Sequence, residues 1–340
     1  MPGVSSPHRQ EMRPADRPAW QIDRLGAPLL VSWQLTRDCD LACLHCCTAS
    51  APGKRLPDEL SAGEAMRLAD DILGARVPYV MLCGGEPLVV PHWLDLAERL
   101  GAGGVQLKIE TNGQRLDPTH LERLARLPIR SVQVSLDADT QETYARQRPG
   151  GSLAKVHAAC CWIHEAGLPL EVTFAPTRLN IHEAEDVIER AMALGAFRFS
   201  TGKLMRIGTA ARLWQRLEPL PQQYERFRAL LERRAASSHL AGLELCYTPF
   251  STMEGLLASL GEPPATLLVL PQGWVKVAAA LPHICADLRR QTLLEAWDSY
   301  RAAWRDREVM SAAQRAAERE ILHSSANDWI PPRQFGNISS

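Results

Sequence analysis

The feature that most constrains the fold is a regular alternation of short apolar runs with amphipathic segments between residues 29 and 201. The apolar runs predict strands at 29–35, 79–82, 105–109, 131–136, 170–174 and 197–201. The segments between them predict helices at 61–73, 92–100, 118–126, 152–166 and 182–194. Strands and helices that alternate in this way form right-handed βαβ units around a parallel sheet. The pattern therefore predicts an α/β fold, a partial, TIM-like (β/α)6 barrel.

The pattern changes after about residue 205, which suggests a second region. Helices are predicted at 222–234, 253–260 and 292–305, and a hairpin at 266–280 with a turn at Pro271-Gln272-Gly273. We therefore expect an N-terminal mobile arm at 1–24, a barrel at 25–205, a smaller α+β cap at 206–324 and a loose tail at 325–340.

Composition limits the classes of function. The 340 residues include 38 basic and 39 acidic side chains, and these are mixed along the chain instead of grouped in blocks. This balance argues against nucleic acid or a membrane surface as a partner. The first twenty residues are polar and proline-rich, unlike a signal peptide, so a cytoplasmic location is expected. In that compartment the nine cysteines are not expected to form a disulfide framework.

Three cysteines at short spacing carry the strongest chemical signal. Cys39, Cys43 and Cys46 form the pattern CxxxCxxC in the loop after the first predicted strand. Three thiolates in one loop can bind three irons of a cubane cluster and leave the fourth iron open. The alternative is a zinc site, which His45 or Cys47 could complete. Structural zinc more often uses two separated CxxC-type pairs, and the chain has no second pair at that spacing.

Polar motifs follow the next three predicted strands. Gly84-Gly85-Glu86 follows the second strand, Glu110-Thr111-Asn112 ends the third, and Ser135-Leu136-Asp137 ends the fourth. The C-terminal ends of parallel strands meet at one mouth of a barrel, where functional residues gather. Each motif alone could be a turn or a solvated acid, and Arg148 could be a surface charge. Their order after the cysteine loop favours one shared site.

Over about residues 25–205, this order of motifs resembles the radical S-adenosylmethionine (SAM) superfamily. The resemblance implies that Cys39, Cys43 and Cys46 hold one 4Fe-4S cluster, whose open iron binds SAM. It places His45 near the adenine. It also implies contacts to SAM from further residues: Gly84, Gly85 and Glu86 at the methionine amino group, Glu110, Thr111 and Asn112 near the ribose and sulfonium, Ser135 and Asp137 beside the ribose, and Arg148 at the methionine carboxylate.

The C-terminal region resembles the SPASM or twitch extension of a subgroup of that superfamily. The subgroup includes pyrroloquinoline quinone and haem d1 maturation enzymes and peptide-modifying enzymes. Residues 268–281 and the helix that begins at 293 match its hairpin and helix, but Ala278 stands where relatives have a cysteine. Only Cys246 and Cys285 follow Gly202, so we expect a hairpin over the barrel mouth without an auxiliary cluster.

A missing cluster would leave room for a thiol that returns a hydrogen atom to a substrate radical. Cys285, in the expected loop after the hairpin, is the first candidate, and Cys246 and the pair Cys160-Cys161 are the others. The alternative is that a free cysteine packs as a small buried apolar residue.

The resemblance implies an enzyme that cleaves SAM reductively to a 5′-deoxyadenosyl radical. This radical would abstract hydrogen from a peptide or from a cofactor or natural-product precursor. An epimerase or rearrangement enzyme acting on a sugar or another small biosynthetic intermediate is the alternative. A non-catalytic iron-sulfur protein and a zinc-dependent protein are less favoured. A flavodoxin or ferredoxin type of electron donor would be a partner.

Overall fold

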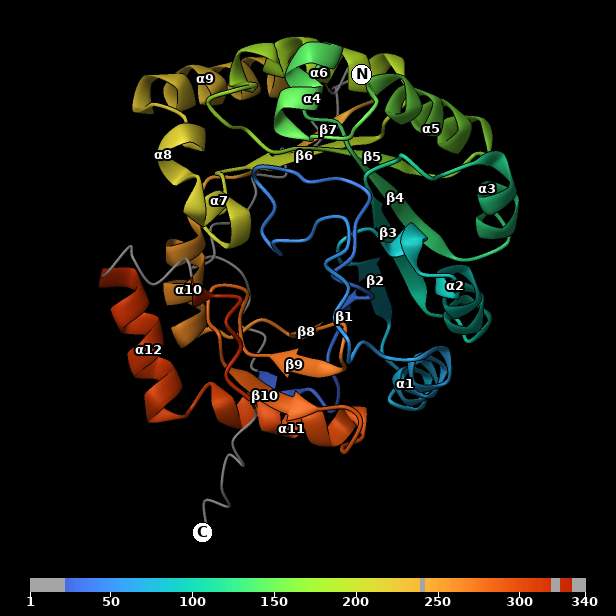
Figure 1. Cartoon of the computed structure of the whole chain (residues 1–340), viewed down its shortest axis with the longest axis vertical. Helices are drawn as coiled ribbons and strands as arrows, with labels where there is room; N and C mark the ends of the chain where they lie inside the picture. Colours follow the sequence, from blue (N-terminus) through green and yellow to red (C-terminus); the bar gives the residue numbers. More distant parts are fainter. Residues whose placement is uncertain (1–21, 239–241, 319–324, 332–340) are drawn as a thin grey trace, which may run out of the picture.

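A single curved sheet organises the computed structural model, which describes residues 22–238, 242–318 and 325–331 (Figure 1). Within these residues the strand order is β10-β9-β8-β1-β2-β3-β4-β5-β6-β7. The strands are β1 (Leu30–Gln34), β2 (Tyr79–Cys83), β3 (Gln106–Thr111), β4 (Ile129–Ser135), β5 (Leu170–Phe174), β6 (Arg198–Gly202), β7 (Glu244–Thr248), β8 (Thr266–Val269), β9 (Trp274–Lys276) and β10 (Ile284–Asp287).

The barrel prediction is confirmed. Strands β1 to β7 are parallel to their neighbours, and all six predicted strands occur at the expected places. The sheet does not close, because β7 and β10 are its edge strands. These two strands were not predicted. β7 is five residues long and β10 is four residues long. Short segments of this kind carry little periodic signal.

Helices cover the outer face of the sheet (Figure 1). Those over the barrel strands are α1 (Ala62–Gly74), α2 (Trp93–Ala102), α3 (Pro118–Leu124), α5 (Leu153–Glu165), α6 (Ala184–Ala193) and α9 (Pro221–Ser238). Alternate strand residues such as Val31, Leu107 and Val172 point towards these helices and are fully buried. The residues between them face the opposite, concave side, because side chains alternate along a strand. That side carries polar groups, which marks it as the inside of the barrel.

The remaining helices flank the mouth or the C-terminal region. They are α4 (Gln141–Gln147), α7 (Gly208–Arg212), α8 (Trp214–Leu217), α10 (Thr252–Gly261), α11 (Leu293–Ala303) and α12 (Arg307–Glu318). Helix α4 begins at Thr140, whose hydroxyl caps the backbone N–H of Thr143. It ends at Arg148. This short helix was not predicted, yet its end decides where the Arg148 side chain lies.

The predicted hairpin exists, but its expected position over the barrel mouth is wrong. β8 pairs in parallel with β1, with Leu30 beside Thr266, and β9 then pairs antiparallel with β8. The hairpin therefore extends the barrel sheet beyond β1, because β1 would otherwise leave an open edge of backbone hydrogen-bonding groups. The sheet is continuous across the expected boundary at residue 206.

Part of the expected loose tail is packed against the barrel. Ala326 is fully buried, Asn327 Nδ2 donates to the carbonyl oxygen of Cys47 at 2.8 Å, and Ile330 pairs with His283. Residues 1–21 of the expected arm and 332–340 of the tail lie outside the described residues.

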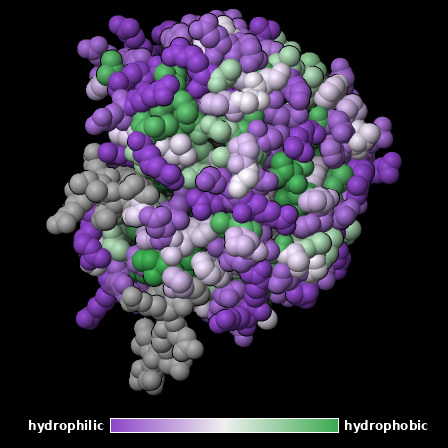
Figure 2. Space-filling view, in the orientation of Figure 1, coloured by the Kyte–Doolittle hydropathy of each residue, from purple (hydrophilic) through white to green (hydrophobic). Residues whose placement is uncertain are grey.

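The apolar side chains gather in the core. Figure 2 shows a face that is mostly hydrophilic, with apolar residues in small separate groups. No helix among the described residues has the length and apolar character needed to cross a membrane.

Candidate active site

The loop after β1 brings the three predicted cysteines together. Cys39 and Cys43 are buried around Leu41, and Cys46 packs against them. Each sulfur lies near a nitrogen donor. The backbone N–H of Leu41 lies 3.4 Å from Cys39 Sγ, that of Ser50 lies 3.3 Å from Cys46 Sγ, and Arg148 Nη1 lies 3.5 Å from Cys43 Sγ. Such donors stabilise negative charge on sulfur.

The three cysteines fit a metal group that is bound through thiolates. Burial raises the pKa of Cys39 to about 12 and that of Cys43 to about 11, so without a metal both thiols are neutral. A metal group would supply the positive charge that favours the thiolates. Within the described part of the chain, no group of three His, Cys, Asp or Glu residues is arranged to hold a single metal ion.

The glycine pair after β2 is required by close packing against the stem of this loop. Gly84 has φ +140°, and a Cβ there would lie 2.7 Å from the carbonyl oxygen of Thr36. A Cβ on Gly85 would overlap the carbonyl oxygen of Asp38. The backbone N–H groups of Gly85 and Glu86 donate to these same two oxygens, at 2.8 and 3.0 Å. Only glycine allows this approach, so the pair sets the position of the loop.

Glu86 joins the ends of β2 and β3. Its carboxylate is fully buried and accepts from Thr111 Oγ1 at 2.8 Å, the Asn112 N–H at 2.7 Å and the Leu88 N–H at 3.1 Å. Burial raises the pKa of Glu86 to about 7, although these three donors favour its ionised form. Asn112 Nδ2 then donates to Asp40 Oδ1 at 2.7 Å, within the cysteine loop. A chain of hydrogen bonds thus runs from two strand ends to the cysteines.

Asp137, Arg148 and His45 form a second buried group. Arg148 Nε donates to Asp137 Oδ2 at 2.6 Å, and His45 Nε2 lies 3.1 Å from the same oxygen. Burial opposes the charge on Asp137, but Arg148 and His45 hold its pKa well below the usual range. His45 Nδ1 is buried and has no hydrogen-bond partner among the described residues. The three residues were predicted separately, and the structure brings them together beside Cys43.

Glu110 and Ser135 face the inside of the barrel at the ends of β3 and β4. Glu110 shares its face with Lys108, whose Nζ lies 3.8 Å from Glu110 Oε1 and 3.0 Å from Glu171 Oε2. Because Lys108 and Glu171 meet across the intervening strand β4, this is the concave face. Ser131 Oγ donates to Glu171, so Ser131 lies on the same face. Side chains alternate along a strand, and Ser135 comes four residues later on β4, so it also faces the inside of the barrel.

The expected placement of Cys285 is wrong. It lies in β10 and not in a loop, is 3% exposed within the main core, and its Sγ donates to the Val275 carbonyl oxygen at 3.3 Å. Cys160 and Cys161 lie on α5, outside the barrel. Cys246 is in register with Ser200, whose Oγ donates to Glu171, so Cys246 lies on the concave face. Strand pairing that the sequence did not reveal causes this difference.

Sequence reasoning missed two acids that hold the cysteine loop. Asp40 accepts from Asn112 and pairs with Arg115, with Nε 3.1 Å from Oδ2. Glu59 accepts from the Thr36 hydroxyl and the Arg37 N–H, both at the loop's start. The position of Asp40 between the first two cysteines was the available signal, whereas Glu59 offers none before the loop is folded.

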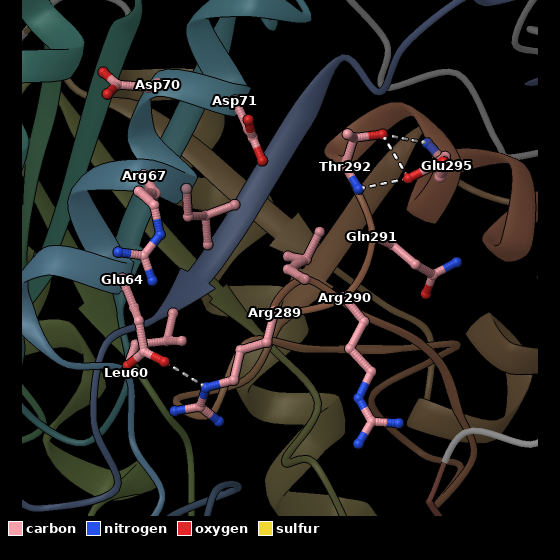
Figure 3. Close-up of a pocket in the computed structure, with 12 residues that line it drawn as sticks. Leu60, Glu64, Arg67, Asp70, Asp71, Arg289, Arg290, Gln291, Thr292 and Glu295 are labelled. Atoms are coloured by element: carbon pink, nitrogen blue, oxygen red, sulfur yellow. Dashed lines mark hydrogen bonds and ion pairs between the residues drawn. The ribbon is translucent and has the colours of Figure 1, made fainter.

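A pocket of about 420 Å³ lies elsewhere, between α1 and the segment that leads into α11 (Figure 3). Its lining is mainly charged, and Arg289 Nε crosses it to Glu64 at 2.9 Å. None of the predicted site residues lines it. The candidate site is therefore the strand ends around the cysteine loop.

Comparison with protein families agrees with this assignment, since residues 33–191 match the model of the Radical SAM superfamily. This segment is a radical SAM domain. The family uses a 4Fe-4S cluster and SAM. The match includes all three cysteines and the motifs at the ends of β2, β3 and β4.

Curated relatives of the radical SAM domain include maturation and synthesis enzymes. The mycofactocin maturase MftC of Mycobacterium ulcerans is 34% identical over 239 residues, which are 65% of this chain and 64% of that protein. An AdoMet-dependent heme synthase of Methanosarcina barkeri is 29% identical over 209 residues, which are 60% of this chain and 58% of that protein. The chain thus spans less than two thirds of the length of either relative.

A solved structure shares the fold. Streptococcus suis SuiB bound to S-adenosylmethionine aligns with a TM-score of 0.65 and 15% identity, over 80% of this chain and 66% of SuiB. This likeness supports the partial-barrel fold.

Proposed function

We propose that this protein is an enzyme that uses one 4Fe-4S cluster to cleave SAM reductively and thereby start radical chemistry on a substrate. The observation that carries the proposal is the gathering of Cys39, Cys43 and Cys46 at the strand ends, each sulfur beside a nitrogen donor. The domain match supports the same reaction.

The chain's own residues would hold the reactants and keep water away. Cys39, Cys43 and Cys46 would bind the cluster. When bound, the cluster supplies one electron to SAM, which separates into methionine and a 5′-deoxyadenosyl radical. We place SAM against the ends of β2, β3 and β4, where Gly84, Gly85, Thr111, Asn112 and Ser135 lie. Glu110 faces the barrel interior, where the substrate would lie.

Anaerobic protein reconstituted with iron and sulfide is expected to convert SAM to 5′-deoxyadenosine and methionine after reduction, slowly, even without substrate. The products can be quantified by liquid chromatography and mass spectrometry. A flavodoxin or ferredoxin with its reductase is the proposed physiological donor and would replace dithionite. Formation of S-adenosylhomocysteine without deoxyadenosine would instead indicate polar methyl transfer and would contradict the proposal.

The proposed substrate is a peptide or a cofactor precursor. Relatives named maturase and heme synthase support these two classes. The concave face supports a polar substrate, because Lys108, Glu110 and Glu171 give it charged groups. Peptide is the first choice, and a sugar or other small intermediate the second. Deuterium transfer from labelled candidate substrates into 5′-deoxyadenosine would distinguish them.

We further propose that a thiol returns a hydrogen atom to the substrate radical. Geometry favours Cys246 over Cys285, because Cys246 lies on the concave face and Cys285 is buried within the core. The step would transfer a hydrogen atom from sulfur to carbon and leave a sulfur radical, so an external one-electron donor and a proton from solvent would be needed to restore the thiol.

Replacing Cys246 with alanine is therefore expected to lower product formation, while hydrogen abstraction continues. Wild-type enzyme in deuterated water should place deuterium at the product carbon, and the Cys246→Ala enzyme should not. Cys285→Ala serves as the control and should retain deuterium incorporation. The opposite result for the two variants would reassign the donor to Cys285, and product free of deuterium in wild type would exclude a thiol donor.

A further inference from the structure

The pair formed by Arg148 and Asp137 is turned towards the cysteine loop. Three nitrogens of the Arg148 guanidinium lie near protein atoms: Nε bonds Asp137, Nη1 lies 3.5 Å from Cys43 Sγ, and Nη2 lies 3.3 Å from His45 Nε2. Both side chains are buried, 10% and 0% exposed. Each of the three guanidinium nitrogens thus already has a neighbour in this chain, and one of these neighbours is the Cys43 sulfur.

The positive charge of Arg148 lies closer to the Cys43 sulfur than the negative charge of Asp137 does. The positive guanidinium contacts the sulfur of Cys43 directly, and the carboxylate binds the guanidinium through Nε. Asp137 Oδ1 accepts from the backbone N–H of Ala175 at 2.7 Å, after β5, which keeps the carboxylate in place. Arg148 lies at the end of α4 and Asp137 follows β4, so two separate elements position the pair beside Cys43.

We propose that Arg148 and Asp137 are positioning residues that set the reduction potential of the cluster, with opposite signs. The proposal rests on the proposed function, since it requires a cluster on Cys39, Cys43 and Cys46. It assigns Arg148 a role at the cluster, instead of the pairing with the methionine carboxylate that the family resemblance implied.

The physical reason is the added charge. Reduction places one more negative charge on the cluster, and charges interact strongly in a buried site because water screens them poorly. Hydrogen bonds to the sulfurs and net charge are known to set such potentials. The guanidinium at Cys43 therefore favours the reduced state, and the carboxylate behind it opposes that state.

The test is a redox titration of the reconstituted full chain without SAM, followed by electron paramagnetic resonance of the reduced cluster. In Arg148→Gln we expect the ratio of reduced to oxidised cluster at a fixed potential to fall about tenfold, a shift of about 59 mV for one electron. Asp137→Asn should move the ratio in the opposite direction. Arg148→Lys keeps the charge and should stay near wild type. Arg146→Gln, an exposed arginine two residues away, is the matched control and should cause no shift.

Two further measurements keep the result interpretable. Arg148→Gln leaves the Asp137 charge buried without its partner, so this variant could fail to fold. In that case the direction of the potential shift is still tested by three other variants: Arg148→Lys, Asp137→Asn and the double variant Arg148→Gln/Asp137→Asn. SAM affinity is measured on the same proteins by equilibrium binding. Shifts of the same sign in Arg148→Gln and Asp137→Asn, or unchanged potentials, would overturn the proposal. The proposal would also be overturned if Arg148→Lys kept the wild-type reduction potential but bound SAM more weakly. Wild-type protein that forms no cluster would instead refute the proposed function.

Discussion

Replacing Cys39, Cys43 and Cys46 together with alanine is expected to remove the iron-sulfur cluster and abolish SAM cleavage. Wild-type protein should bind about four irons per chain after anaerobic reconstitution, and the triple variant close to none. The three sulfurs share one loop and pack against one another. Cys47 is the cysteine that remains in this loop in the triple variant, and a single thiolate is too few for a cubane cluster. Iron and sulfide analysis with visible absorption measures the effect.

The control for this variant is Cys161→Ala, which removes an exposed thiol on α5 and should keep the full iron content. Each single variant of the three cysteines should also lose the cluster. About eight irons in wild-type protein, or iron-sulfur absorption that survives in the triple variant, would show that the chain holds a second cluster elsewhere.

Loss of the Glu86 carboxylate is expected to have the next largest effect. Glu86→Ala leaves three buried donors, on Leu88, Thr111 and Asn112, without their acceptor. An unsatisfied buried group costs about 1–3 kcal/mol, so we expect a loss of about 3 kcal/mol or more in the free energy of unfolding. Asn112 would also lose its support beside Asp40 and Cys39. Cluster content and SAM affinity should therefore fall together.

Thermal unfolding, iron content and SAM binding measure this effect. Glu86→Gln should be less damaging, because its amide keeps one acceptor oxygen, although its NH2 group replaces the other. Glu122→Ala, at an exposed position on α3, is the control for removing a carboxylate. A Glu86→Ala protein of wild-type stability that loses only SAM affinity would show that the carboxylate serves SAM directly and not the loop.

Much of the barrel could be predicted because its signals are local. Six apolar runs with amphipathic segments between them placed the parallel strands correctly, since strand and helix periods are visible in short windows. The spacing of Cys39, Cys43 and Cys46 within one loop is likewise a local property. Strand pairing at the edges is not local. β8 pairs with β1 across more than 230 residues of sequence, which no periodicity encodes.

The sequence by itself determined which chemistry the site residues can perform and that the strand ends would bring them to one mouth. The sequence features that predicted this are the spacing of the cysteines, the glycine pair and the acids at the ends of β3 and β4. Only the tertiary structure decided which of them touch. Glu86 binds Asn112, Arg148 binds Asp137 and Cys43, and Cys285 packs in the core while Cys246 faces inwards. The reason is that burial and hydrogen bonding depend on neighbours far along the chain, which residue type and spacing do not specify.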